Sequence, residues 1–338
     1  MKILGINCSA HDTGVAYIKD GKIMCALEEE KMVGIKSRYI QWKMPTQSMD
    51  YLLSEYNLTF DDFDYVAVST PAQQFYLKNF NIEKIFTYSH HKSHALGSYF
   101  TSGFQGKCIS LSHDGKGETS RGKIYLCEDG FVEEVYSSPT PTTASLAGIW
   151  GLATIRLGWQ MLKDEGKVVG LAGHGEYVHE YYEIFKNILL LEDGLKTKLS
   201  TFHRETDSAG GSVYQELFSN FFQFMGSNIA WKRDDYRKNI AYCGQLVLEE
   251  TIIEILNTLH EKYPHVTKLA LSGGVFANVK MNKKINELEW VDEVFITPPM
   301  GDEGLSLGSL LLVLKQLHPQ FKPIQLENVF LGLEYTPE

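Results

Sequence analysis

The segment Ser89-His90-His91-Lys92-Ser93-His94 contains the residues with the clearest chemical potential. Ser89 can cap the N-terminus of a helix. On that helix His90 and His94 share one face, one turn apart, while His91 points about 100° away. Two imidazoles at this spacing can chelate one metal ion. An exposed or core-bound histidine cluster is the alternative, and the small and apolar residues 95–100 favour a buried helix.

A third ligand is predicted far along the chain, at Asp302 in the loop of residues 299–304. The glycines on either side of it, Gly301 and Gly304, let the backbone turn sharply. Asp302 also precedes an apolar helix, where a carboxylate is favoured, so a plain helix cap is the alternative. Two histidines and one carboxylate with open positions are typical of Fe²⁺, and Zn²⁺ or Mn²⁺ also fit. We therefore predict a divalent metal site at His90, His94 and Asp302.

Two glycine turns are candidates for binding phosphate. One, residues 113–118, follows a predicted strand, and the other, residues 272–274, leads from a strand into a helix. Backbone amides at such turns and at helix N-termini bind anions. The Asp114 carboxylate could instead hold a metal or its water. Neither turn matches a P-loop or dinucleotide motif, so a tight structural turn is the alternative for each. Lys167 could supply positive charge for a phosphate, and a solvated lysine is the alternative there. The predicted nucleotide and phosphate contacts are Asp114, Gly115, Lys116, Gly117, Lys167, Gly273, Gly274 and Asn278.

His11 and Asp12 form a candidate acid–base pair in the first polar turn. An imidazole with an ordinary pKa near 6.5 can accept a proton from a hydroxyl at neutral pH. Ordinary turn formation by Asp12-Thr13-Gly14 is the alternative.

The elements that position these residues repeat along the chain. Strands at residues 2–7, 15–19 and 22–27 form a meander closed by the hairpin turn Asp20-Gly21, and strands 108–112 and 122–127 begin a second one. We predict an α/β fold with two related lobes around a central cleft. Lobe I spans residues 1–104 and is completed by the final helix, 303–317; lobe II spans 105–302. A mostly helical insertion covers about 137–238, with its clearest helices at 180–191 and 212–224, and residues 318–338 form a tail.

Composition limits the partners. The chain has 338 residues and a net charge of −10, which disfavours a nucleic-acid partner. It has no run of 18 apolar residues, and Met1 leads directly into a predicted strand. We therefore expect neither a membrane span nor a secretory signal, and a cytoplasmic protein. The five cysteines are scattered and read as reduced thiols.

Taken together, these motifs resemble the NodU/CmcH family of O-carbamoyltransferases. They occur in family order across nearly the whole chain: Gly5-Ile6-Asn7, His11-Asp12, Leu27-Glu28-Glu29-Glu30, His90-His91-Lys92-Ser93-His94-Ala95, Ser112-His113-Asp114-Gly115, residues 165–172, Ser272-Gly273-Gly274-Val275 and Gly301-Asp302-Glu303-Gly304. The resemblance implies an actin-like ASKHA fold of the Kae1-like type.

The family scheme has two steps. A YrdC-like domain makes carbamoyl-adenylate from carbamoyl phosphate and ATP, and the Kae1-like domain passes the carbamoyl group to an acceptor hydroxyl of a small molecule, sugar or nucleoside. The resemblance implies that the three metal ligands hold iron, that His11 is the general base oriented by Asp12, and that the glycine turns bind phosphate and adenosine. It implies that the tail approaches a YrdC-like domain, which the chain lacks up to Glu338, so we expect adenylate formation to need that domain or a partner protein. A homodimer is a further option. The aromatic insertion is expected to shape the acceptor pocket through Trp150, Arg156, Trp159 and Trp231.

Three other functions remain open. A tRNA threonylcarbamoyl transferase would have a similar metal site, and the acidic net charge opposes it. A non-catalytic ASKHA nucleotide-binding subunit would need neither His11 nor the metal ligands. A sugar kinase would require Mg²⁺, for which a two-histidine site is a poor cage.

Overall fold

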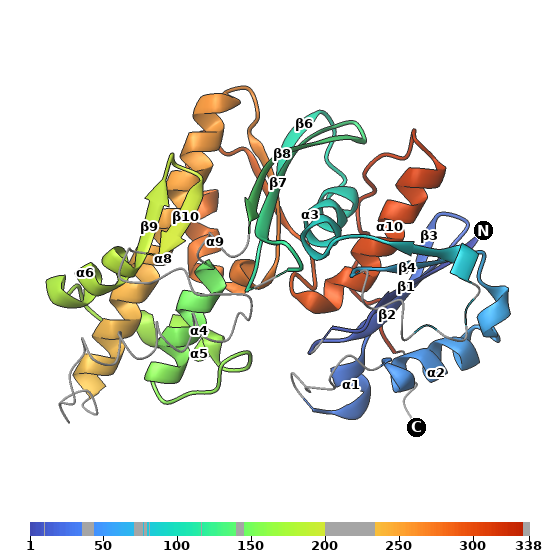
Figure 1. The fold of residues 1–338 in the computed structure, drawn as a ribbon, viewed down its shortest axis with the longest axis horizontal. Coiled ribbons are helices and arrows are strands. Elements are labelled where there is room, and N and C mark those ends of the chain that lie inside the picture. The colour runs from blue at the N-terminus through green and yellow to red at the C-terminus, as the bar shows by residue number, and fades with distance from the viewer. Residues whose placement is uncertain are drawn as a thin grey trace.

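The computed structural model describes residues 1–9, 11–35, 44–70, 77, 80, 82–115, 117–139, 145–199 and 234–333. In this part of the chain, two five-stranded sheets stand on either side of a pair of central helices, and a group of helices extends from the second sheet (Figure 1).

The first sheet opens the chain and has the strand order β3-β2-β1-β4-β5. β1, β2 and β3 form the predicted antiparallel meander, and β4 and β5 extend it in parallel. Asp20 and Gly21 have φ values of 50° and 83°, as a two-residue hairpin turn requires. The elements are β1 (Lys2–Asn7), β2 (Gly14–Lys19), β3 (Lys22–Glu28), α1 (Glu29–Val33), α2 (Thr46–Glu55), η1 (Phe60–Asp62), β4 (Tyr65–Val68), η3 (Ile82–Lys84) and β5 (Ile85–Thr87).

The second sheet repeats this pairing pattern with the order β12-β11-β6-β7-β8. Its meander of β6, β7 and β8 is antiparallel, while β11 and β12 run parallel to β6. The strands are β6 (Lys107–His113), β7 (Ser120–Glu128), β8 (Phe131–Pro139), β11 (Lys268–Ser272) and β12 (Glu293–Ile296). The repeated meander predicted from the sequence is therefore present.

Helices α3 (His90–Thr101) and α10 (Leu305–Leu317) lie side by side between the two sheets (Figure 1). α10 packs on β1, β2 and β4, and α3 packs on β6, β7 and β11. The helices cross closely at Gly97 and Gly308, where a Cβ on Gly97 would lie 2.8 Å from the Gly308 Cα. The predicted boundary at residue 104 assigns α3 to lobe I, whereas α3 packs on the second sheet.

The region after β8 is mostly helical, with one departure from the sequence prediction. The helix expected at 180–191 ends at Ile188, and the chain then forms a hairpin of β9 and β10. The elements are α4 (Leu146–Arg156), α5 (Glu165–Ala172), α6 (His179–Ile188), β9 (Leu189–Glu192), β10 (Lys196–Leu199), α8 (Asp234–Lys262), η5 (Gly274–Ala277), α9 (Val279–Asn286) and η6 (Asp302–Gly304). The helix predicted at 212–224 lies outside the described residues.

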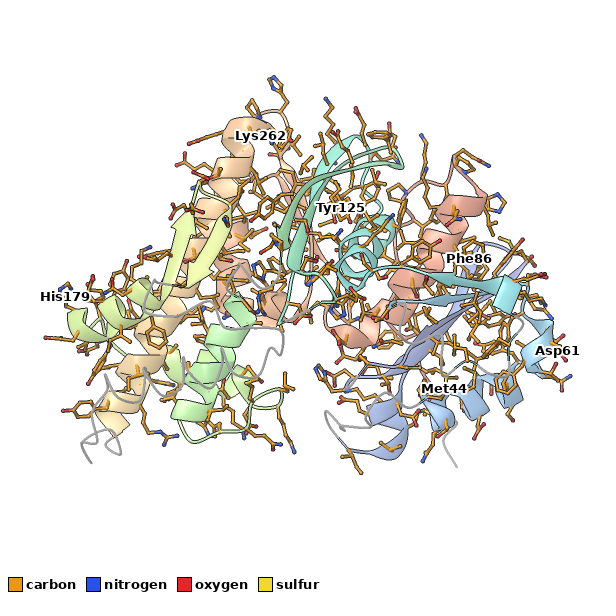
Figure 2. All side chains as sticks on the ribbon, in the orientation of Figure 1. Met44, Asp61, Phe86, Tyr125, His179 and Lys262 are labelled. Carbon is orange, nitrogen blue, oxygen red and sulfur yellow. The ribbon has the colours of Figure 1, made fainter. Side chains whose placement is uncertain are left out.

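The apolar side chains fill the space between sheets and helices. Tyr125 of β7 is buried among α3 and α10, whereas His179 lies at the outer edge of α6 (Figure 2). All five cysteines are buried and free. Within the described ranges, no helix combines the length and apolarity needed to cross a membrane. After α10 the tail returns to the first sheet, where the Ala26 amide donates to the Leu331 carbonyl.

Candidate metal centre

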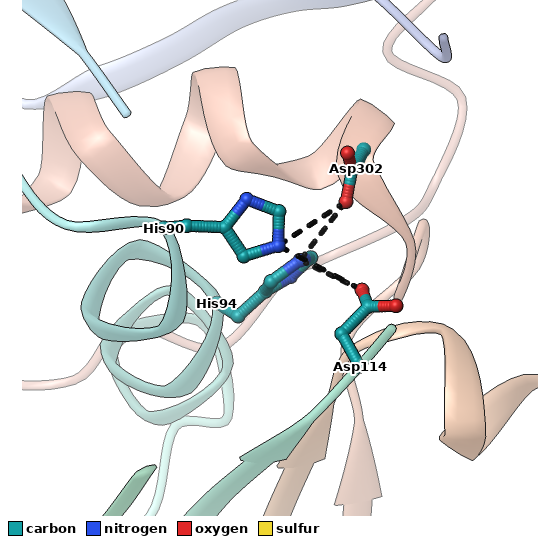
Figure 3. Close-up of side chains that lie close together, drawn as sticks. All are labelled: His90, His94, Asp114 and Asp302. Atoms are coloured by element: carbon teal, nitrogen blue, oxygen red, sulfur yellow. Dashed lines mark hydrogen bonds and ion pairs between the residues drawn. The ribbon is translucent and has the colours of Figure 1, made fainter. Parts of the chain in front are cut away.

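Four side chains converge at the start of α3: His90, His94, Asp114 and Asp302 (Figure 3). The Asp302 Oδ1 atom lies 3.4 Å from His90 Nε2 and 3.3 Å from His94 Nε2. The Asp114 Oδ2 atom lies 3.8 Å and 3.3 Å from the same two nitrogens. Ligand atoms about 2.1 Å from a common ion are roughly 3.0–3.5 Å apart, so the spacing fits a single cation.

Separate elements bring these side chains together. α3 presents His90 and His94 one turn apart, and Asp114 follows directly after β6. Asp302 opens the short turn η6, which runs into α10. Because the close glycine contact brings α10 against α3, a carboxylate 208 residues after His94 reaches its imidazole.

The electrostatics of the cluster favour charged side chains despite their burial. Burial raises the pKa of Asp114, but the adjacent imidazoles of His90 and His94 hold that pKa well below its usual value. For Asp302, burial is likewise outweighed, chiefly by the charge of His90, and the pKa is lowered. For His94, burial is outweighed by hydrogen bonds to Asp114 and Asp302, which raise its pKa to about 9. The two carboxylates of the cluster thus favour a positive charge on His94.

The chemistry of the donors fits a divalent metal. The buried Nε2 atom of His90 faces the two carboxylates but has no hydrogen-bond partner within the described residues. Two imidazole nitrogens and two carboxylate oxygens suit Fe²⁺, Mn²⁺ or Zn²⁺ better than Mg²⁺. His91 points elsewhere, as predicted: its Nε2 contacts the Ser120 carbonyl at 3.0 Å.

The structure places Asp114, predicted as a phosphate contact, beside the predicted metal ligands. The glycine turns serve to orient it: the amide of Gly115 donates to Oδ1 at 2.6 Å, and the amide of Gly274 to Oδ2 at 3.1 Å. The amides of Gly117 and Gly273 donate to the Ser120 and Met300 carbonyls. All four amides expected to bind phosphate thus have partners within the protein. Lys116 lies outside the described residues.

Two other predicted phosphate contacts, Asn278 and Lys167, have partners within the protein. Asn278 caps α9, with its Oδ1 accepting from the Met281 amide, and its buried side chain is paired with Gln245. Lys167 is 57% exposed and forms an ion pair with Asp164 at 2.8 Å.

The predicted acid–base pair lies beside the cluster. His11 Nδ1 is 2.7 Å from Asp12 Oδ2, so the contact with Asp12 involves Nδ1 and not Nε2. Asp12 adopts the left-handed region at φ 52°, and its Oδ1 atom is buried without a hydrogen-bond partner in the described chain. Burial lowers the pKa of His11, but the Asp12 hydrogen bond and the charges of Asp302, Asp12 and Asp114 together raise it to about 9.

The N-terminus of α3 is capped by a residue that sequence reasoning missed. Ser89 is the N-cap residue, as expected, but its side chain makes no capping hydrogen bond. Instead, the backbone amide of His90 donates to both carboxylate oxygens of Glu118, at 3.1 and 3.2 Å. The sequence contained one indication of this cap, because Glu118 is an acidic residue at the end of the polar turn that carries Asp114.

The four residues predicted to shape an acceptor pocket lie in different surroundings. Trp150 is 7% exposed and belongs to the hydrophobic core around α8. Trp159 is partly buried, with the Arg237 guanidinium 5.0 Å above its ring. Trp231 and the side chain of Arg156 lie outside what the structure describes.

Solved structures share this fold. The chain superposes on component A of the (R)-2-hydroxyglutaryl-CoA dehydratase of Acidaminococcus fermentans with a TM-score of 0.53, covering 92% of this chain and 97% of that one at 14% identity. Full-length HypF in its phosphate- and nucleotide-bound form gives a TM-score of 0.52, covering 94% of this chain and 56% of that one at 14% identity. These likenesses confirm the predicted actin-like ASKHA fold.

Curated relatives align along most of the chain. Nodulation protein NolNO of Sinorhizobium fredii is 25% identical over 363 residues, covering 96% of this chain and 49% of the relative. An uncharacterised protein of Methanocaldococcus jannaschii is 28% identical over 306 residues, covering 85% of this chain and 46% of the relative. The chain thus spans about half the length of these relatives. The family model described as "Carbamoyltransferase N-terminus" matches residues 2–74 and 69–311, so the chain belongs to the carbamoyltransferase N-terminus family.

Proposed function

We propose that this chain transfers a carbamoyl group from carbamoyl-adenylate to the hydroxyl of a small molecule, sugar or nucleoside at a metal-dependent site. The observation that carries the proposal is the convergence of two imidazoles and two carboxylates from α3, β6 and η6 within 4.8 Å, beside the His11–Asp12 pair. Family membership supplies the reaction class.

In this proposal, four residues bind the metal and two others handle the proton. His90, His94, Asp114 and Asp302 would hold the cation, most suitably Fe²⁺, which when bound would polarise a phosphate oxygen of the adenylate as a Lewis acid. In the transfer step, the acceptor oxygen forms a bond to the carbamoyl carbon as the carbon–oxygen bond to phosphate breaks and AMP leaves. The hydroxyl proton passes to His11 Nε2, and Asp12 stabilises the resulting imidazolium.

The protonation state of His11 is the demanding part of this scheme. A base must be neutral, and with a pKa of about 9 His11 is mostly protonated at neutral pH in the metal-free protein. Asp302 and Asp114 contribute to that value, so neutralisation of their charges lowers it toward the working range.

The first test is elemental analysis of the purified chain for iron, manganese and zinc. We expect about one equivalent of metal in the wild type and a large loss in His90→Ala and Asp302→Ala. Asp292→Asn is the matched control, since that aspartate is exposed. Failure of the wild type to retain or take up any of the three metals would remove the basis of the proposal.

The second test is the transfer itself. Synthetic carbamoyl-adenylate is supplied with a panel of hydroxyl acceptors, and carbamoylated product and AMP are measured. We expect transfer by the wild type and at least a hundredfold loss in His11→Ala, which removes the base. Parallel reactions with ATP and carbamoyl phosphate, with and without a YrdC-like protein, show whether adenylate formation needs a partner.

A further inference from the structure

We propose that Asn7 is the positioning residue that fixes the His11–Asp12 loop against the turn carrying Asp302. Asn7 ends β1 and is completely buried. Its amide joins the backbones of the two loops that carry the proposed base and one proposed ligand.

The hydrogen bonds of this one amide span three segments. Its Nδ2 group donates to the Asp302 carbonyl at 2.7 Å, the Asp12 carbonyl at 3.0 Å and the Ser9 hydroxyl at 3.1 Å. Its Oδ1 accepts from the Ser9 amide at 3.3 Å and from the Ser69 hydroxyl at 3.1 Å, at the end of β4. Ser9 in turn donates to the His11 carbonyl.

An amide meets both requirements of this position. The Asp302 and Asp12 carbonyls need a donor, and the Ser9 amide and the Ser69 hydroxyl need an acceptor. A carboxylate would place an oxygen against both carbonyls, and an apolar side chain would leave all of these polar groups without this partner. The hydrogen bond from the buried Asn7 amide to the Asp12 carbonyl thus helps to stabilise the left-handed backbone conformation of Asp12.

The consequence concerns both halves of the proposed site. The Asp302 carbonyl is hydrogen-bonded to Asn7 at the end of β1. This bond fixes the backbone of Asp302, from which its carboxylate side chain extends. Because the Asp12 carbonyl is bound to the same NH₂ group, the His11–Asp12 pair keeps its distance from the metal position. Outer partners of this kind typically change metal affinity by about 10–100-fold when they are removed.

The test uses Co²⁺ alone as the probe, and it rests on the metal site proposed above. Visible absorption during Co²⁺ titration reports both the dissociation constant and the coordination geometry. We expect Asn7→Ala to bind Co²⁺ about 10–100-fold more weakly than wild type, with an altered spectrum. Thr251→Ala is the control for general destabilisation, because it removes a buried hydrogen bond in α8, from the Thr251 hydroxyl to the Val247 carbonyl.

Asn7→Asp gives the sharper comparison, because charge and positioning predict opposite results. Its added negative charge alone would strengthen cation binding, whereas repulsion from the two carbonyls would weaken it by displacing the turn. Weaker binding with an altered spectrum supports positioning. Wild-type affinity in both variants, tighter binding in Asn7→Asp, or an equal loss in Thr251→Ala overturns the role of Asn7. If the wild type itself binds no Co²⁺, the proposed metal site fails and this inference falls with it.

Discussion

In the proposed metal site, His94 would have to exchange a proton for the cation, because an imidazole nitrogen cannot carry both. Its pKa in the folded, metal-free protein is about 9, because Asp114 and Asp302 outweigh the effect of burial. A ligand nitrogen must be deprotonated, so cation binding near neutral pH releases a proton.

We therefore expect the apparent affinity for Mn²⁺ to rise about tenfold between pH 7 and pH 8 and to level off above pH 9. Isothermal titration calorimetry at pH 7 in two buffers of different ionisation enthalpy measures the proton release directly. Identical apparent enthalpies in both buffers would show that His94 is already neutral.

The same shift has a definite sign for the stability of the metal-free protein. The folded pKa of His94 lies above its unfolded value near 6.5, so its contribution is fully present below pH 6.5 and is lost as the pH rises through 9. Thermal unfolding in the presence of a chelator, followed from pH 6 to pH 9.5, would show this decline.

Glu118 is the residue through which the Asp114 turn and the His90 helix depend on each other. It accepts two hydrogen bonds from the His90 amide and places a negative charge at the N-terminus of α3. We expect Glu118→Ala to lower the free energy of unfolding by about 1 kcal/mol and to weaken metal binding as well. Glu118→Gln keeps an acceptor and loses less, and the exposed Glu133→Ala is the surface control. Chemical denaturation and metal titration of the three variants test the order; equal values for all three would refute the cap.

Among the helices, the contact of α3 with α10 decides whether the proposed site can form. A Cβ on Gly308 would overlap the Ser93 carbonyl oxygen and lie 3.4 Å from the Gly97 Cα. Gly308→Ala should therefore push α10 away from α3, cost about 1–3 kcal/mol of stability and move Asp302 from His94, weakening metal binding. Gly170→Ala in α5 is the matched control, because its Cβ meets open space and helix propensity predicts a gain of up to about 1 kcal/mol. Denaturation midpoints and metal titrations of both variants provide the comparison; unchanged metal affinity in Gly308→Ala would contradict the argument.

The strands and hairpins could be predicted because their signals are local. Asp20-Gly21 and Asp129-Gly130 predict hairpin turns, and the structure has positive φ values at all four residues. The strands on either side of each turn could be predicted from its position. The shared face of His90 and His94 is equally a local property of a helix.

The assignment of Asp114 depended on information that is not local. The parallel register of β11 with β6 pairs Ser272 with Ser112, and this brings the Gly274 amide to the Asp114 carboxylate. The sequence of the turn is compatible with either phosphate or metal. Only the pairing of two strands, about 160 residues apart, decides where its amides and its carboxylate point.

For the molecule as a whole, the acidic charge bears on the choice of acceptor. A net charge of −10 offers little counterion release on a polyanion, so we expect no retardation of tRNA in a gel shift at moderate salt. The acceptor would then be a small hydroxyl compound. A retarded band that weakens steeply as salt increases would instead favour a tRNA substrate.

The proposed cation would also join the two sheets. Asp302 belongs to the first, through Asn7 at the end of β1 and through α10, while Asp114 extends from the second. α3 is tied to the second sheet by hydrogen bonds from Ser98 to the Leu271 carbonyl and from Ser110 to the Ala95 carbonyl. One bound ion would therefore cross-link α10 to α3 and the sheet behind it.

Removing the metal should for this reason lower the stability of the entire chain. With free metal at about 100 times its dissociation constant, the free energy of unfolding rises by about 2.7 kcal/mol. Thermal melts with Mn²⁺ and with a chelator measure the difference. Asp114→Asn, which removes one of the linking charges, should lose most of it, whereas the exposed Asp292→Asn should keep it. Because each ligand element is anchored to a different part of the core, we expect a single cooperative transition that shifts as a unit; a metal-dependent shift confined to an early, separate transition would mean that the ion stabilises only its own loops.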